Sequence, residues 1–140
     1  MPLSDAVYAR LLALRTGLRR FERWSEQQAR AAGLTPAQHQ LLLAVRGHSD
    51  PHGPTIGEVA DYLLLKHHSV VGLVDRAEAA GLVRRSRNPE DQRMVRLRIT
   101  SAGSRRLDRL SALHLEELDR LGAQMPANWE EPGPKRRPAR

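Results

Sequence analysis

Arginine dominates the groups in this 140-residue chain that could do chemistry. The chain holds 23 basic and 16 acidic residues, a formal charge of +7. Residues 84–106 contain eight arginines and two acids, so this stretch carries nearly all of that net charge. Guanidinium groups bind phosphates and base edges through paired hydrogen bonds. The stretch therefore suits a polyanion binder, although a solvated charged face has the same composition.

Several other chemistries lack the residues they need. The chain has no cysteine, which excludes disulfides, Cys-based zinc sites, thiol catalysis and cysteine redox sensing. We find no Gly-rich phosphate loop, nucleophile elbow or metal-hydrolase helix, so we expect no enzyme and no cofactor. His48 with His52, and His67 with His68, raise a metal-sensing alternative. Neither pair has a clear third or fourth ligand, so we assign no metal.

The chain shows no targeting or membrane segment. Its apolar runs are far too short to span a bilayer, and no signal-peptide pattern opens it. We therefore expect a cytoplasmic protein with no membrane partner.

Two capping boxes mark the starts of helices that could position the arginines. In residues 35–38 and 55–58, a threonine is followed three residues later by Gln or Glu, which predicts helices over 36–46 and 56–63. A further helix is expected over 66–80, ended by Gly81. Its inward face is predicted to carry Val70, Leu73, Val74 and Ala77. Two short helices joined by a tight turn, the second with a polar outer face, form the helix-turn-helix pattern.

A β-hairpin is expected to follow. Leu82–Arg85 predicts a short strand, and Asn88-Pro89-Glu90-Asp91 supplies turn residues. In the second strand, Val95, Leu97 and Ile99 alternate with Met94, Arg96 and Arg98, which predicts a half-buried strand with a basic outer face.

The two ends of the chain are predicted to be long helices with apolar surface to cover. Over 5–32, Val7, Leu11, Leu14, Leu18 and Phe21 follow the spacing of a coiled-coil seam. The last helix, about 101–123, carries leucines on more than one face. The partner of the seam is another subunit, the chain's own C-terminal helix, or both.

These elements predict one mostly helical domain with a small β-hairpin. We expect a winged helix-turn-helix over residues 1–125. Helices 3–32 and 101–123 are its dimerisation helices, and 35–100 is its DNA-binding lobe. Residues 126–140 are rich in Pro and Arg and are expected to form a flexible tail.

In a winged helix-turn-helix, DNA contacts concentrate at three places, namely the first turn of the recognition helix, the N-terminus of the preceding helix and the hairpin. The first turn of the recognition helix reads base edges, and the N-terminus of the preceding helix clamps a phosphate. The first place holds Lys66, His67, His68 and Ser69, with Arg76 flanking it, and the second holds Thr55. The hairpin arginines are candidates for phosphate contact or for bracing of the wing, namely Arg84, Arg85, Arg87, Arg96 and Arg98.

Several segments in this order resemble the multiple antibiotic resistance regulator (MarR) family. They are Leu34-Thr35-Pro36-Ala37-Gln38, Leu73-Val74-Asp75-Arg76, Ala80-Gly81-Leu82-Val83-Arg84-Arg85, Asn88-Pro89-Glu90-Asp91-Gln92-Arg93 and Leu97-Arg98-Ile99-Thr100-Ser101-Ala102-Gly103. The resemblance covers roughly residues 5–121. It implies a homodimeric regulator, usually a repressor, whose DNA binding a small ligand weakens. It also places Arg93 at the wing tip in the minor groove, with Asp91 orienting it.

The resemblance further implies an effector pocket between the dimer helices and the DNA-binding lobe. Candidate residues are Arg20, Phe21, Trp24 and His39, which could equally be core and satisfied polar groups. The chain departs from the family at Val71 and Gly72, where long or polar side chains are common. It also turns at Met125-Pro126, where many relatives continue into a further helix, so we expect the dimer to rest on 3–32 and 101–123.

The leading hypothesis is a sequence-specific, ligand-responsive, homodimeric repressor that binds a pseudo-palindromic operator on double-stranded DNA. The main alternative is a nonspecific architectural DNA-binding protein driven by the basic stretch. An interaction module that has lost DNA binding is a further alternative.

Overall fold

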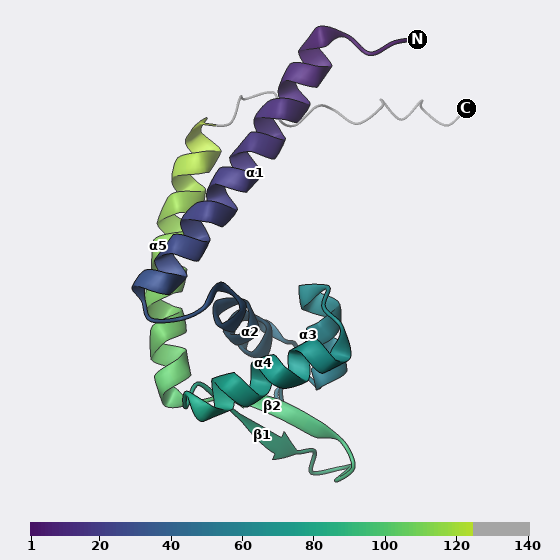
Figure 1. Cartoon of the computed structure of the whole chain (residues 1–140), viewed down its shortest axis with the longest axis vertical. Coiled ribbons are helices and arrows are strands. Elements are labelled where there is room, and N and C mark those ends of the chain that lie inside the picture. Colours follow the sequence, from purple (N-terminus) through teal and green to yellow (C-terminus); the bar gives the residue numbers. More distant parts are fainter. Residues whose placement is uncertain (125–140) are drawn as a thin grey trace, which may run out of the picture.

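The computed structural model describes residues 1–124, which form five helices and one hairpin. In chain order these are α1 (Asp5–Ala31), α2 (Pro36–Gly47), α3 (Ile56–Leu63), α4 (His67–Ala79), β1 (Val83–Arg87), β2 (Val95–Ile99) and α5 (Ser101–Gln124). Figure 1 shows α1 and α5 side by side as a long arm, with the other elements gathered at one end. We call α1 and α5 the arm, and residues 32–100 the lobe. The predicted fold class is confirmed, whereas the predicted tail over 126–140 lies outside the described residues.

The core lies in the lobe and is closed by the start of α5. The predicted inward face of α4 is confirmed, since Val70, Leu73, Val74 and Ala77 are all buried. They pack in one cluster with Leu41 of α2 and Leu107 of α5. The lobe therefore holds its helices together with apolar contacts from its own chain.

Local signals in the sequence begin the helices where predicted. Thr35 Oγ accepts from the Gln38 amide at 3.1 Å, and Gln38 Oε1 accepts from the Thr35 amide at 3.0 Å. Thr55 and Glu58 make the same pair of bonds at 3.2 and 3.1 Å. α3 ends at Leu64, whose φ of 54° is left-handed and turns the chain toward α4. A non-glycine residue rarely adopts this conformation. The Leu64 side chain is exposed, and the Leu65 amide donates to the Ala60 carbonyl across the turn at 3.1 Å.

The hairpin is antiparallel and is extended by a third chain segment. β1 pairs with β2 so that Arg84 lies opposite Arg98 and Ser86 opposite Arg96. On the other edge of β2, the Leu97 amide donates to the Pro54 carbonyl at 2.8 Å. Gly53 permits this approach because its φ is 87° and a Cβ there would collide with the Leu97 carbonyl oxygen. The loop before α3 is thereby fixed against the hairpin.

The arm covers only part of its apolar surface. Val7, Leu14 and Phe21 of the predicted seam are half-buried, whereas Leu11 and Leu18 remain 49% and 50% exposed. On α5, Leu115 and Leu118 are also exposed. The chain's own C-terminal helix thus covers one side of the seam and leaves the other open. Within residues 1–124, no helix is long and apolar enough to cross a membrane.

Candidate nucleic-acid interface

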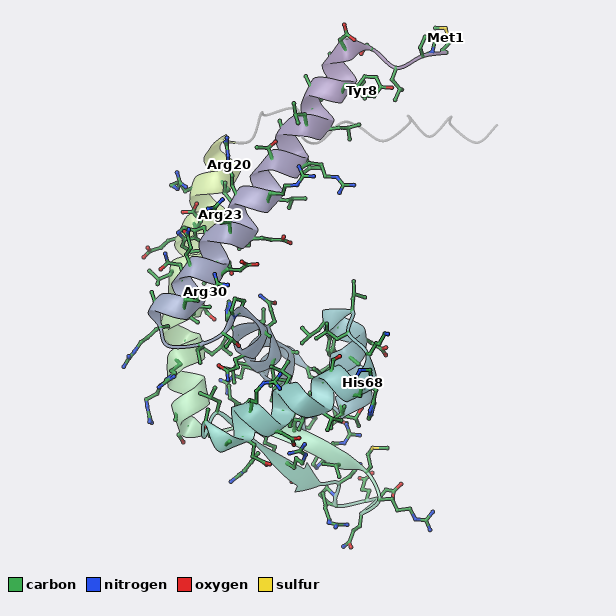
Figure 2. The ribbon with its side chains drawn as sticks, viewed as in Figure 1. Met1, Tyr8, Arg20, Arg23, Arg30 and His68 are labelled. Carbon is green, nitrogen blue, oxygen red and sulfur yellow. The ribbon has the colours of Figure 1, made fainter. Side chains whose placement is uncertain are left out.

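The first turn of α4 presents a row of exposed polar side chains. Lys66, His67, His68 and Ser69 are all exposed, and Lys66 occupies the N-cap without a side-chain capping bond. Figure 2 shows His68 projecting from the end of α4 that lies away from α5. Arg76 is exposed further along the same helix. None of these side chains makes a hydrogen bond or ion pair with a described residue, so their donors and acceptors face solvent.

Gly72 of α4 is not required by packing. A Cβ built at this position meets only the end of the Arg76 side chain, at 3.3 Å from Nη1. Because that guanidinium group can move aside, an alanine fits here without rearranging the backbone. The glycine thus leaves an open position on the helix surface rather than filling a tight one.

The hairpin tip carries an exposed arginine on an ordered turn. Arg93 is exposed and has no partner among the described residues. Asp91 Oδ1 accepts from the Arg93 backbone amide at 3.0 Å, and Arg87 Nη1 donates to the Gln92 carbonyl at 3.1 Å. Asp91 therefore acts on the backbone of Arg93 rather than on its guanidinium group. The Arg93 side chain stays free to reach outward from a fixed turn.

Arg85 ties the hairpin to α4. Its guanidinium group contacts Asp75 at 2.6 Å and Glu78 at 2.8 Å, and its amide donates to Glu78 at 2.9 Å. The hydrogen bond to Asp75, with that to Glu78, raises the pKa of Arg85 above its ordinary value. Arg84 on the same strand is exposed and has no partner among residues 1–124. The hairpin arginines thus divide into paired and unpaired groups.

Arg96 does not lie on an outer basic face, and that prediction is wrong. Its side chain is only 13% exposed, and its Nη1 donates to the Gly53 carbonyl at 2.9 Å. Glu58 Oε1 lies at 3.4 Å and Asp50 Oδ2 at 3.6 Å from the same guanidinium group. The prediction from strand alternation treated the outer edge of β2 as uncovered. Residues 50–55 instead pair along that edge and cover Arg96.

The carboxylates around Arg96 are part of a wider polar network. Glu58 also accepts from Thr55 in the capping box and contacts His48 Nε2 at 3.1 Å. His48 Nδ1 lies 2.7 Å from the Tyr62 hydroxyl. The Thr55 amide is the largest cause of the lowered pKa of Glu58, and the His52 amide is the largest cause of the lowered pKa of Asp50. Both carboxyls are held in their charged forms.

The residues suggested for an effector pocket form an aromatic cluster at the junction of arm and lobe. Phe21 and Trp24 of α1 and His39 of α2 meet around a fourth ring, that of His114 on α5. The His114 ring centroid lies 4.9 Å from that of Trp24 and 4.8 Å from that of His39. Arg20 is exposed on α1 (Figure 2). It is not among the residues whose rings meet in the cluster.

His114 was missing from the sequence prediction although it links the two parts of the chain. Its Nδ1 donates to the Leu110 carbonyl at 2.7 Å, and its Nε2 lies 2.6 Å from Ser25 Oγ. A signal was present, because His114 follows the buried Leu107 and Leu110 at helical spacing. His39 is 4% exposed, and burial lowers its pKa, with His114 adding to that effect.

No metal cluster emerges from the histidines of the described chain. Within residues 1–124, no group of three or more His, Asp or Glu side chains is placed to hold an ion. His52 instead contacts Asp50, and His48 contacts Glu58 and Tyr62.

Comparisons with known proteins agree with this arrangement. A family model described as MarR family matches residues 32–94. The HTH-type transcriptional repressor MdtR of Bacillus subtilis is 29% identical over 80 residues, which cover 57% of this chain and 50% of that protein. The present chain thus spans about half the length of that curated relative.

Two solved structures show how far the likeness of fold extends. CouR from Rhodococcus jostii, bound to p-coumaroyl-CoA, is 26% identical with a TM-score of 0.69, covering 83% of this chain and 78% of CouR. The MepR–DNA complex of S. aureus is 17% identical with a TM-score of 0.68, covering 91% of this chain and 88% of MepR. At that identity, the second comparison supports the fold alone.

Proposed function

We propose that this chain, in which residues 32–94 match a MarR family model, is a sequence-specific DNA-binding regulator that works in the cytoplasm as a homodimeric repressor. The observation that carries the proposal is the first turn of α4. Its polar side chains are exposed and unengaged within the described chain, while the opposite face of the helix is buried. A helix of this kind enters the major groove and reads base edges.

The division of the hairpin arginines assigns different roles to them. Arg93 and Arg84 are unpaired in the described chain and are free to bind phosphate or the minor groove. Arg85 and Arg96 are engaged with carboxylates, so we assign them to bracing. Arg87 braces the turn through the Gln92 carbonyl. At Thr55, the groups that would bind a phosphate are the backbone amides at the start of α3, because the Thr55 hydroxyl is used in the capping box.

The open side of the arm supports a homodimer. Leu11, Leu18, Leu115 and Leu118 are exposed on two neighbouring helices, and a second copy of the arm would cover them. Two recognition helices related by a twofold axis bind two half-sites about one helical turn apart. The operator would therefore be a pseudo-palindrome.

A small-molecule effector is the remaining part of the proposal. CouR is known bound to p-coumaroyl-CoA. In this chain the candidate effector site is the aromatic cluster, with Phe21, Trp24 and His39 as its walls and Arg20 at its edge. A ligand that separates these rings would change the angle between the arm and the lobe, and so the spacing of the recognition helices.

Selection of bound sequences from a random duplex pool at about physiological salt tests the DNA-binding proposal. We expect an enriched inverted repeat whose half-sites lie about 10 base pairs apart. The alternative, an architectural protein, predicts salt-sensitive binding with no enrichment.

The Arg93→Ala variant gives the matched test of the wing. It should weaken binding to the selected repeat about tenfold or more, because one groove contact is lost. Arg19→Ala removes the same charge from the exposed surface of the arm and should leave binding unchanged. Equal losses for both variants would show that net charge, rather than the wing, determines the affinity.

A further inference from the structure

Arg96 differs from the unpaired arginines of the hairpin in its surroundings. It is held by a carbonyl oxygen and two carboxylates, while Arg98, two residues along the same strand, is half-buried and has no partner in the described chain. Side chains two residues apart on a strand share a face. The difference between them therefore comes from what covers that face, not from the direction in which they point.

Three segments meet at the Arg96 guanidinium group. Gly53 and Asp50 belong to the loop before α3, and Glu58 lies in the first turn of α3. Arg96 itself lies in the strand that returns from the wing tip, three residues after Arg93. The contact thus joins the wing directly to the first helix of the helix-turn-helix.

The same contact has unusual energetics. Burial of a charge is costly, and ion pairs that are mostly buried add little net stability. Arg96 Nε is also buried without a hydrogen-bond partner in the described chain. Such a network can fix the geometry of the contact, because the planar guanidinium group must be oriented toward the Gly53 carbonyl and both carboxylates at once.

The geometry matters because the wing is held along only part of its length. Arg85 fixes the β1 side of the hairpin to α4, through Asp75 and Glu78. On the β2 side, the side-chain contact with the rest of the lobe that lies closest to the wing tip is made by Arg96. Residues 92–95, between Arg96 and the tip, are exposed. The Leu97 amide still donates to the Pro54 carbonyl, so release of Arg96 would free β2 only from Arg96 toward the wing tip.

We propose that Arg96 is the positioning residue of the wing: by joining β2 to Gly53, Asp50 and Glu58, it sets where Arg93 lies relative to the recognition helix. This inference rests on the proposed DNA-binding function for its consequence, but the placement of the wing can be measured without DNA. By setting this position, Arg96 would determine whether the wing and α4 can enter their grooves at the same time.

Paired spin labels measure that placement directly. The chain has no cysteine, so Asp61→Cys on α3 and Gln92→Cys at the wing provide the only two attachment sites. Excess unlabelled chain ensures that each dimer carries one labelled copy. Arg96→Gln should broaden and shift the distance distribution between the two labels. Arg98→Leu, the matched control on the same face, should leave it unchanged.

Two further variants separate positioning from a general loss of folding. Arg96→Lys keeps the charge but not the planar fork, so it should restore the distribution only in part. Asp50→Asn removes one partner and should give a smaller broadening, with the thermal unfolding midpoint close to wild type. An Arg96→Gln distribution identical to wild type would overturn the inference, whatever the DNA experiments show.

DNA binding then reports the consequence. On the selected repeat, Arg96→Gln should lower the ratio of specific to nonspecific affinity about tenfold and remove minor-groove protection from hydroxyl radicals at the wing sites. Arg98→Leu should weaken both affinities equally. If the wild-type chain selects no repeat, the proposed function fails, while the spin-label result still decides the role of Arg96 in placing the wing.

Discussion

The lobe and the arm both contain many leucines, but they differ in how far one chain buries these side chains. Lobe residues Leu41, Val59, Val74 and Leu97 are fully buried within one chain, and α5 supplies the remaining contacts. Arm residues Leu12 and Leu18 are 66% and 50% exposed in that chain. The lobe therefore holds a complete core within one chain, while the arm leaves apolar side chains uncovered, which we propose a second copy covers. Stability and assembly should respond to mutations in different parts of the molecule.

The largest effect on stability should come from the lobe. Leu41→Ala deletes buried methyl groups and leaves a cavity, which should lower the free energy of unfolding by about 2–5 kcal/mol. Urea unfolding followed by circular dichroism measures the change. A loss no larger than that of an alanine substitution at the exposed Leu12 would contradict the view that the lobe contains the core.

The largest effect on assembly should come from the arm. Leu18→Glu places a charge on the open side of α1 and should raise the dimer dissociation constant about a hundredfold. Analytical ultracentrifugation measures the constant. Gln27→Glu adds the same charge to an exposed polar position on the opposite side of the helix and should not change it. A monomeric wild-type chain at micromolar concentration would refute the comparison between arm and lobe.

Within the lobe, the two capping boxes should differ in importance. Thr35→Ala and Thr55→Ala each remove an N-cap and should cost about 1 kcal/mol of unfolding free energy. We expect Thr55→Ala to cost more, because its partner Glu58 also contacts His48 and Arg96. Thermal unfolding of both variants under identical conditions gives the ranking. Equal losses would mean that the Arg96 network is independent of the cap.

The smallest predicted effect is a pH dependence of stability, which arises at the junction of the arm and the lobe. His39 has a lowered pKa, so the unfolded chain takes up its proton more readily than the folded chain does. Stability from this group is present at neutral pH and declines as the pH falls below about 6.5, the ordinary histidine value. The lowered pKa values of Asp50 and Glu58 act in a separate window, below their ordinary acidic values.

Urea midpoints measured between pH 5 and pH 8 test this dependence. His39→Gln should flatten the profile over that range, while His67→Gln, which alters an exposed histidine, should leave its slope unchanged. A wild-type profile that rises toward acid would contradict the direction.

Much of the fold was predictable because its signals are local. The capping boxes at Thr35 and Thr55 and the inward face of α4 depend on residues within a turn or two of each other. The turn at Asp91 also begins with a side chain that bonds its near neighbours. Such patterns can be interpreted without knowing what the rest of the chain does.

The errors came from contacts between distant segments. Arg96 was predicted to face outward because strand alternation says nothing of the loop that pairs along the other edge of β2. His114 was missed because its partners Ser25 and His39 are distant in the chain. Pattern and resemblance together predicted the DNA-contacting residues, and the structure places Lys66, His68 and Arg93 at the exposed surface.

The continuous course of α1 has a mechanical consequence. This helix runs without interruption for 27 residues, and Ser25 near its end contacts His114, whose ring also meets that of His39 in the lobe. About 20 residues of helix beyond that contact form a rigid lever roughly 30 Å long, so a tilt of about 5° moves its far end by roughly 2.6 Å. A tilt of a few degrees at the aromatic cluster would therefore move the far end of α1 by a distance comparable with the length of a hydrogen bond.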